Sequence, residues 1–176
     1  MADFRHGGTF IGLLRDRGRG RVTVDANGMA VPWYALEDGR DVRHTHRAIE
    51  AQAKLHRAAG ATQIAGLATG LPLWRWGDDL GAFVQRLQRI PLRAGGWKLF
   101  AAHQMGSCRM GTDPATSVAG PWGELHDVKG VWIGDASAFP TPSGTNPMIT
   151  IMALAHRNAE AVVAAATTAT TAAAAS

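Results

Sequence analysis

The stretch Gly134-Asp-Ala-Ser-Ala-Phe-Pro-Thr-Pro-Ser-Gly-Thr-Asn-Pro-Met-Ile-Thr-Ile-Met-Ala-Leu-Ala155 decides how the last third of this chain folds. Its first residues close the apolar run Gly130-Val-Trp-Ile-Gly-Asp135, which predicts a buried strand. A long loop follows, and Asn146 suits the N-cap of a helix that has Pro147 at its first position, where the missing N–H costs nothing. We expect this helix to end at Ala166, with a frayed or disordered tail over residues 167–176, which contain only Thr, Ala and Ser.

A second stretch, Ala102-His-Gln-Met-Gly-Ser-Cys-Arg-Met-Gly111, places a histidine in a loop. Such a loop can hold the ring of His103 against a ligand, and a neutral imidazole is a suitable base near neutral pH. The helix start after Asn146 presents free N–H groups and partial positive charge, which suit a phosphate or an electron-rich ring. Both features also fit roles without a ligand, namely a structural histidine and an ordinary helix cap.

Upstream, the pattern alternates between short strands and helices. Residues 21–34 predict a β-hairpin around Asn27-Gly28, a dipeptide that suits turns with positive φ. Residues 41–59 predict a helix that stops at Gly60, and residues 79–89 predict a second helix with an apolar stripe. Residues 62–76 fit either a loop or a strand. The predicted fold class is α+β, with a mainly antiparallel sheet and flanking helices.

The charge of the chain is basic, at a formal +4 with an isoelectric point near 10. Arginines are spread along the sequence, and the densest run, Arg15 to Arg21, is interpreted as a solvated loop, with anion binding as the lesser alternative. No nucleic-acid-binding motif accompanies this charge, so we expect no nucleic-acid partner.

The cysteine, the apolar stretches and the histidines indicate the cellular compartment and whether a metal site is expected. Cys108 is the only cysteine and is expected to be a packing residue in a reducing compartment. Residues 1–9 lack the apolar run of a secretory signal, and no stretch is apolar enough to span a bilayer. The expectation is a cytoplasmic protein. His44 and His46 lack the further ligands that zinc requires, so no metal site is predicted.

Taken together, the two stretches resemble the carboxyl-terminal signature of the glucose/methanol/choline (GMC) oxidoreductases. They are most similar to the long-chain alcohol oxidase branch, and the stretch Gly134–Ala155 also resembles cholesterol oxidase. The resemblance implies an FAD cofactor and a small-molecule alcohol, long-chain or sterol-like, whose CH–OH group is oxidised by hydride transfer to the flavin. It further implies a substrate-binding portion over residues 1–120, and a strand and helix over residues 121–166 that return to an FAD-binding domain.

The same resemblance assigns roles to individual residues. His103 corresponds to the base and orienter of the substrate hydroxyl, and Asn146 to its hydrogen-bonding partner. Asp135 and Ala136 correspond to the segment that approaches the ribityl and phosphate region of FAD. Pro147 and Met148, with Asn146, correspond to the turn that faces the pyrimidine end of the ring. The apolar side chains of the helix are interpreted as core packing: Met148, Ile149, Ile151, Met152 and Leu154.

The glycine-rich turn that binds dinucleotides is not found in this sequence, since Thr23 stands where a third glycine would follow Gly18 and Gly20. The chain therefore resembles the last third of an enzyme, and we expect weak or no flavin binding by these residues alone. A truncated gene, a fragmentary gene model and a separate FAD-binding chain are the three explanations. A non-catalytic remnant or interaction module is the alternative function. Apolar surface around Trp132 and the helix after Pro147 is expected to be exposed and prone to association.

Overall fold

The computed structural model describes residues 4–174. These residues form two compact units, each described by itself below. The first unit contains the residues up to Gly20 together with Pro32–Phe100. The second unit contains Arg21–Val31 together with the residues from Ala101 onward. The predicted domain boundary near Gly120 lies inside the second unit and stays a prediction.

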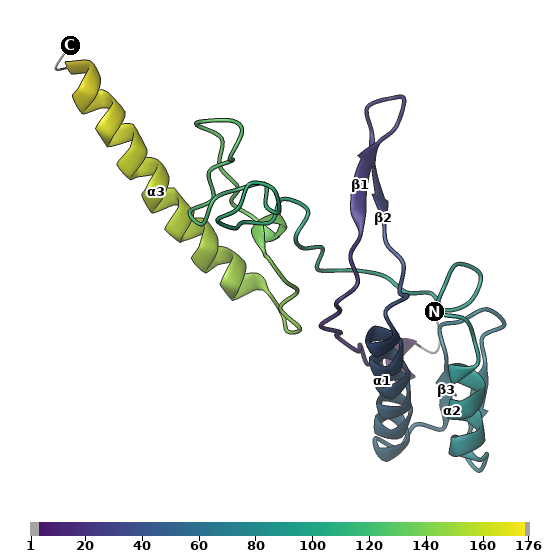
Figure 1. Ribbon diagram of the computed structural model, residues 1–176. Helices are drawn as coiled ribbons and strands as arrows, with labels where there is room; N and C mark the ends of the chain where they lie inside the picture. The colour runs from purple at the N-terminus through teal and green to yellow at the C-terminus, as the bar shows by residue number, and fades with distance from the viewer. Residues whose placement is uncertain (1–3, 175–176) are drawn as a thin grey trace. The chain divides into compact units, whose positions relative to one another are not determined.

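A two-stranded hairpin forms near the start of the chain, as predicted (Figure 1). Its strands are β1 (Arg21–Val24) and β2 (Ala30–Trp33). The carboxylate of Asp25 accepts hydrogen bonds from the N–H groups of Asn27 and Met29, both at 2.8 Å. Gly28 has a φ of 78°. This conformation is one that glycine adopts without strain, and it allows the chain to reverse.

Two helices build most of the first unit, and each begins at an aspartate. After the short 3-10 helix η1 (Phe4–His6) come α1 (Gly39–Ala58) and α2 (Leu80–Gln88). The side chains of Asp38 and Asp79 accept hydrogen bonds from the first free N–H groups of α1 and α2. Helix α1 starts two residues before its predicted start, because the side chain of Asp38 caps it.

Residues 62–76, whose sequence fits either a loop or a strand, form a second hairpin. It pairs β3 (Gln63–Ala65) with β4 (Leu73–Arg75) in antiparallel register, with Ile64 opposite Trp74. The two small antiparallel sheets and the helices confirm the predicted α+β class. Side chains from α1, α2 and this hairpin share one core: Ile49, Ala53, Ile64, Trp74, Leu80, Phe83, Val84 and Leu87.

The second unit consists largely of loops that pack against one end of a long helix. Its helical elements are η2 (Ala136–Ala138) and α3 (Met148–Ala174). The predicted buried strand at residues 130–135 is wrong. Trp132 forms only an isolated bridge to Glu124, and Val131 is exposed. Because the neighbouring residues are themselves irregular loop, the apolar run finds no regular strand with which to form a ladder.

Helix α3 continues beyond the predicted end at Ala166. Alanine is the strongest helix former. The hydroxyl groups of four threonines find acceptors inside the helix, at carbonyls one turn earlier: Thr167, Thr168, Thr170 and Thr171. The segment predicted to be frayed or disordered therefore has helical backbone through Ala174, and residues 175–176 lie outside the described range.

One buried amide fastens α3 to the loops of its unit. Asn158 is 3% exposed, and its Nδ2 donates to the carbonyl oxygen of Ile133 at 2.7 Å. Beside it, the Arg157 guanidinium donates to the carbonyl of Pro121 and lies 5.1 Å from the ring centroid of Trp122. A Cβ atom at Gly123 would lie 2.1 Å from Asn158 Nδ2, so only glycine permits this close approach.

We predict that Asn158→Ala lowers the free energy of unfolding by about 1–3 kcal/mol, since the half-buried Ile133 carbonyl loses its partner. Urea denaturation followed by helical ellipticity measures this loss. His156→Ala is the matched control on the exposed side of α3 and should change the free energy by less than about 0.5 kcal/mol. Equal effects of the two substitutions would show that Asn158 does not fasten the helix.

Candidate functional site

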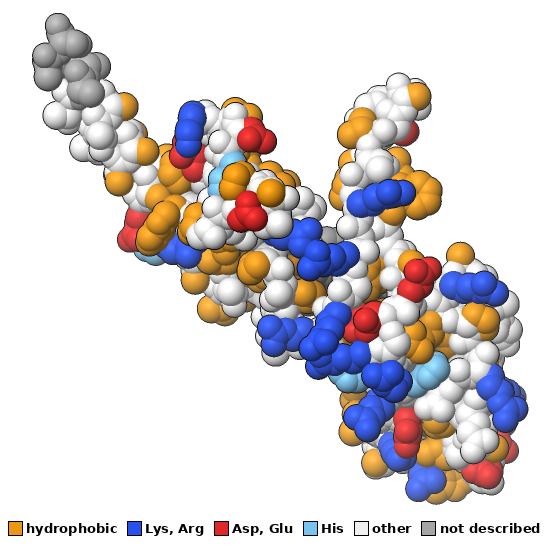
Figure 2. Space-filling model, viewed as in Figure 1, with side chains coloured by type: hydrophobic (Ala, Val, Ile, Leu, Met, Phe, Trp, Pro, Cys, Tyr) orange, Lys and Arg blue, Asp and Glu red, His pale blue; other side chains and the backbone are white. Residues whose placement is uncertain are grey.

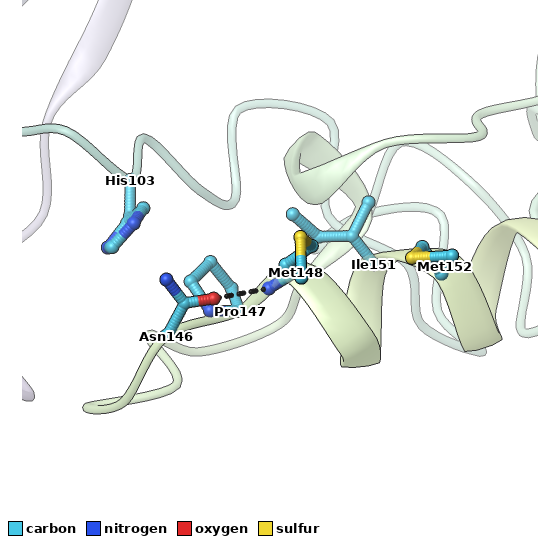
Figure 3. A pocket seen from close by; sticks show the side chains of 6 residues that line it. All are labelled: His103, Asn146, Pro147, Met148, Ile151 and Met152. Carbon is cyan, nitrogen blue, oxygen red and sulfur yellow. Dashed lines mark hydrogen bonds between the residues drawn. The ribbon is translucent and has the colours of Figure 1, made fainter.

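A pocket of about 210 Å³ opens at the start of α3 (Figure 3). His103 contributes to it from the preceding loop, and the other lining residues come from the start of the helix: Asn146, Pro147, Met148, Ile151 and Met152. All of them belong to the second unit. Four of the residues singled out from the sequence, His103, Asn146, Pro147 and Met148, are thus brought together in one pocket.

The two sequence stretches are joined by backbone hydrogen bonds. The N–H groups of Gly106, Cys108 and Met110 donate to the carbonyl oxygens of residues 136, 137 and 138, at 3.2, 3.0 and 2.9 Å. We call residues 102–111 the histidine loop. Alternate residues of this loop therefore bond to consecutive residues of η2. This pairing anchors the segment that follows His103 beside the segment that leads to α3.

Gly106 is required for that pairing. Its φ is 77°, in the left-handed region that favours glycine, and a Cβ at this position would lie 3.1 Å from the carbonyl oxygen of Phe139. Phe139 itself is buried. A side chain at position 106 would therefore be strained and would press against a backbone that cannot easily move.

Asn146 caps α3, as the sequence predicted. Its Oδ1 accepts a hydrogen bond from the N–H of Met148 at 3.1 Å, and the N–H of Ile151 donates to the Pro147 carbonyl at 2.8 Å. This cap fixes which way the amide points. With the oxygen held on the helix, the Nδ2 group lies on the side of His103 (Figure 3), where it offers two N–H donors to the pocket.

The start of α3 also brings positive partial charge to the pocket. The N–H of Met148 is taken up by the cap, and within the described residues no acceptor lies against the N–H groups of Ile149 and Thr150. Free N–H groups and the helix dipole together favour an anion or an electron-rich ring at this end.

Asp135 and Ala136 lie outside the pocket lining, at the junction of the two stretches. Asp135 caps η2, because its Oδ1 accepts from the N–H and the hydroxyl of Ser137. The carbonyl of Ala136 accepts the bond from Gly106. The structure therefore connects these two residues to His103 through the backbone pairing. It does not place them against the same cavity.

The interpretation of the α3 side chains as core is wrong for several of them. Met148, Ile149 and Met152 are 59%, 69% and 61% exposed, and Met148 and Met152 line the pocket together with Ile151. Sequence reasoning missed Ile151 and Met152 as pocket residues. Their spacing from Met148, at i+3 and i+4, places them on its face of the helix, but the pattern does not say whether that face is covered.

Within residues 4–174, no three His, Cys, Asp or Glu side chains gather where they could hold a metal ion. No helix in this range is long and apolar enough to cross a membrane. Cys108 is a half-buried free thiol in the histidine loop.

Comparison with known sequences gives one family. Residues 16–155 match the family described as GMC oxidoreductase. A long-chain-alcohol oxidase of Arabidopsis thaliana is 33% identical over 165 residues, which cover 89% of this chain and 21% of that protein. Paromamine 6'-oxidase of Streptomyces fradiae is 33% identical over 147 residues, which cover 82% of this chain and 22% of that protein.

A shorter sequence match is to an oxidase whose name gives a pyranose as its substrate. Pyranose 2-oxidase of Tricholoma matsutake is 41% identical over 63 residues, or 36% of this chain and 11% of that protein. The chain spans about a fifth of the length of the first two relatives.

We predict that Gly106→Ala breaks the hydrogen bonds that hold the histidine loop and lowers the free energy of unfolding by at least about 1 kcal/mol. A Cβ at this position is disfavoured both by the left-handed backbone conformation and by the contact with Phe139. Hydrogen exchange should show loss of protection at the amides of Cys108 and Met110. Gly134→Ala is the control, since a Cβ there meets nothing within 4 Å. Unchanged protection in Gly106→Ala would contradict the role of the pairing.

Proposed function

Since the chain belongs to the GMC oxidoreductase family, we propose that it supplies the carboxyl-terminal, substrate-facing part of an FAD-dependent enzyme that oxidises the CH–OH group of an alcohol. The observation that carries this proposal is the pocket shared by His103 and the free amide nitrogen of Asn146. A base and a hydrogen-bond donor facing one cavity are the two groups that removal of a hydroxyl proton requires.

In this proposal, His103 takes the hydroxyl proton on a ring nitrogen. Negative charge then develops on the alcohol oxygen, and the Nδ2 group of Asn146 donates a hydrogen bond to it. Because the amide is already oriented by its bond to Met148, this stabilisation needs little reorganisation when the charge appears. FAD, when bound, supplies the two-electron acceptor of the reaction.

The residues at the start of α3 fit a flavin. The unpaired N–H groups of Ile149 and Thr150 and the positive end of the helix suit the electron-rich pyrimidine end of the ring. Asn146, Pro147 and Met148 form the turn that leads into them. Asp135 offers carboxylate oxygens that can accept hydrogen bonds from ribityl hydroxyls, and Ala136 lies next to it.

The substrate class follows from the lining of the pocket. Met148, Ile151 and Met152 present apolar side chains beside the proposed base. An alcohol with a hydrocarbon chain or a sterol skeleton would bury apolar surface there, whereas a sugar would leave its hydroxyl groups without partners. We therefore favour a long-chain or sterol-like alcohol over the sugar named in one of the relatives.

A flavin-bearing partner completes the proposal. The relatives are about five times as long as the matched segment, and we propose that the FAD-binding part acts together with this chain, as a separate chain or as part of a longer protein. A remnant without catalysis is the alternative. Mixing this chain with the product of a neighbouring reading frame that carries a glycine-rich motif, and adding an alcohol, separates the two by bleaching of the flavin absorbance.

We predict that His103→Ala slows alcohol-dependent flavin reduction in that mixture by about 10²- to 10⁴-fold, the usual contribution of a general base. His156→Ala, an exposed histidine on α3, should leave the rate unchanged. A rate that is unaffected by His103→Ala would remove the base from the proposal, and absence of bleaching with the wild-type chain would favour the remnant.

The substitution Asn146→Asp tests the catalytic role of Asn146 without removing its role as a helix cap. The carboxylate still accepts the N–H bond of Met148 and suits the helix start, but it no longer donates a hydrogen bond to the substrate oxygen. We predict an unchanged unfolding free energy and a loss of about 10²- to 10³-fold in the rate of flavin reduction. Unimpaired flavin reduction would show that Asn146 serves only as a cap.

The exposed apolar side chains of α3 lead to a prediction about association. Ile149 and Met152 are exposed, whereas Trp132, expected to be exposed with them, is half-buried. We predict that the chain self-associates and that Ile149→Ser with Met152→Ser shifts it toward the monomer in sedimentation velocity. Val128→Ser with Val131→Ser, on an exposed loop of the same unit, is the control. If the α3 variant self-associates as strongly as the wild-type chain, the associating surface does not include Ile149 and Met152.

A further inference from the structure

Basic charge is concentrated in one of the two units. The first unit holds 14 of the 18 Lys and Arg residues but 8 of the 14 Asp and Glu residues, which gives it a formal charge of +6. The second unit has a formal charge of −2. Residues 1–100 hold 15 of the 18 Lys and Arg residues, so the positive charge is already uneven along the sequence. A strong net charge on one unit favours an anionic partner.

The arginine run near the start of the chain is fastened to α1. The buried carboxylate of Asp41, 2% exposed, accepts the N–H groups of Arg17 and Gly18 at 2.7 and 2.8 Å. Toward the other end of α1, Gln52 Nε2 donates to the Phe10 carbonyl at 3.0 Å, and the ring of Phe10 lies 4.4 Å from that of His56. The segment is a loop with exposed arginines, as predicted, and these contacts hold it antiparallel to α1 over roughly 22 Å.

The arginines of this segment lie beside further arginines on the helix. On α1, Arg40, Arg43 and Arg47 recur at helical spacing and are exposed. None of the six arginines forms an ion pair within the described residues. Figure 2 shows Lys and Arg side chains gathered on the α1 side of this unit. We call these residues the basic surface: Arg15, Arg17, Arg19, Arg40, Arg43 and Arg47.

An apolar edge borders the basic surface. Ile11, Leu13 and Leu55 are 64%, 52% and 52% exposed, and Leu55 precedes His56, against which Phe10 packs. Aliphatic side chains gain free energy when they leave water for the acyl boundary of a bilayer. Phe10 and Tyr34, 43% and 54% exposed, also lie on or next to the segment, and such rings can stack on nucleic-acid bases. The three aliphatic side chains favour a lipid surface, and binding of nucleic acid is the competing outcome of the test.

We propose that the first unit binds the surface of membranes that contain anionic phospholipids. The basic surface contacts the headgroups, and Ile11, Leu13 and Leu55 enter the interface between headgroups and acyl chains. The chain lies on the membrane in this proposal and does not cross it. The proposal does not depend on the alcohol oxidoreductase assignment, so either can fail without the other.

Co-sedimentation of the full chain with vesicles tests the proposal. The chain should bind vesicles of phosphatidylcholine with phosphatidylserine and should bind pure phosphatidylcholine poorly. Replacing Arg15, Arg17 and Arg19 with Gln should weaken binding about fivefold per arginine, or on the order of a hundredfold together. The matched control replaces Arg75, Arg89 and Arg93, exposed arginines of the same unit that lie off α1 and its attached segment, and should retain most of the binding.

Two further variants test the edge and the attachment. Ile11→Ser with Leu13→Ser keeps every arginine and should weaken vesicle binding by at least about tenfold. Asp41→Ala releases the segment and should also weaken binding, with circular dichroism confirming that α1 still forms. Full binding by the Ile11 and Leu13 variant, equal loss in the two arginine triples, or preferential binding of single-stranded nucleic acid would each overturn the proposal.

Discussion

Three backbone hydrogen bonds, from residues 106, 108 and 110 to residues 136, 137 and 138, hold the histidine loop beside the segment that leads to α3. In a unit with little regular structure, this pairing joins segments that are distant in sequence, as the hydrogen bonds of a sheet do in other folds. It needs a glycine at position 106, because the chain must turn there with positive φ directly against Phe139. The position of His103 at the pocket depends on this constraint, since its own side chain is exposed.

The second constraint is the double use of Asn146. One end of its amide closes the start of α3, and this leaves the other end free to face the pocket. A helix cap and a hydrogen-bond donor to substrate are usually weighed as alternatives, but an amide has both an acceptor and a donor and can serve as both. The local interpretation as a cap and the family-based interpretation as a catalytic partner are therefore compatible at this residue.

Sequence patterns predicted the helices, the first hairpin and the cap at Asn146, since these depend on local signals such as Asn27-Gly28 and Asn146-Pro147. They failed where the outcome depends on distant segments. The run Val131-Trp-Ile133 has strand character but no regular neighbour, and the apolar face of α3 is open at Met148 and Met152. The pairing of Gly106 with Ala136 and the attachment of Arg17 to Asp41 join residues 24 or more positions apart, which no local pattern reveals.

The proposed site requires that His103 and Asn146 act on the same oxygen. A double-mutant cycle with His103→Ala and Asn146→Asp, measured as the rate of alcohol-dependent flavin reduction, tests this most directly. Two groups that serve one reacting oxygen should be coupled, so the double variant should lose less than the sum of the single losses, by more than about 1 kcal/mol. Additive losses within about 0.5 kcal/mol would show that the two residues act independently and would contradict the shared site.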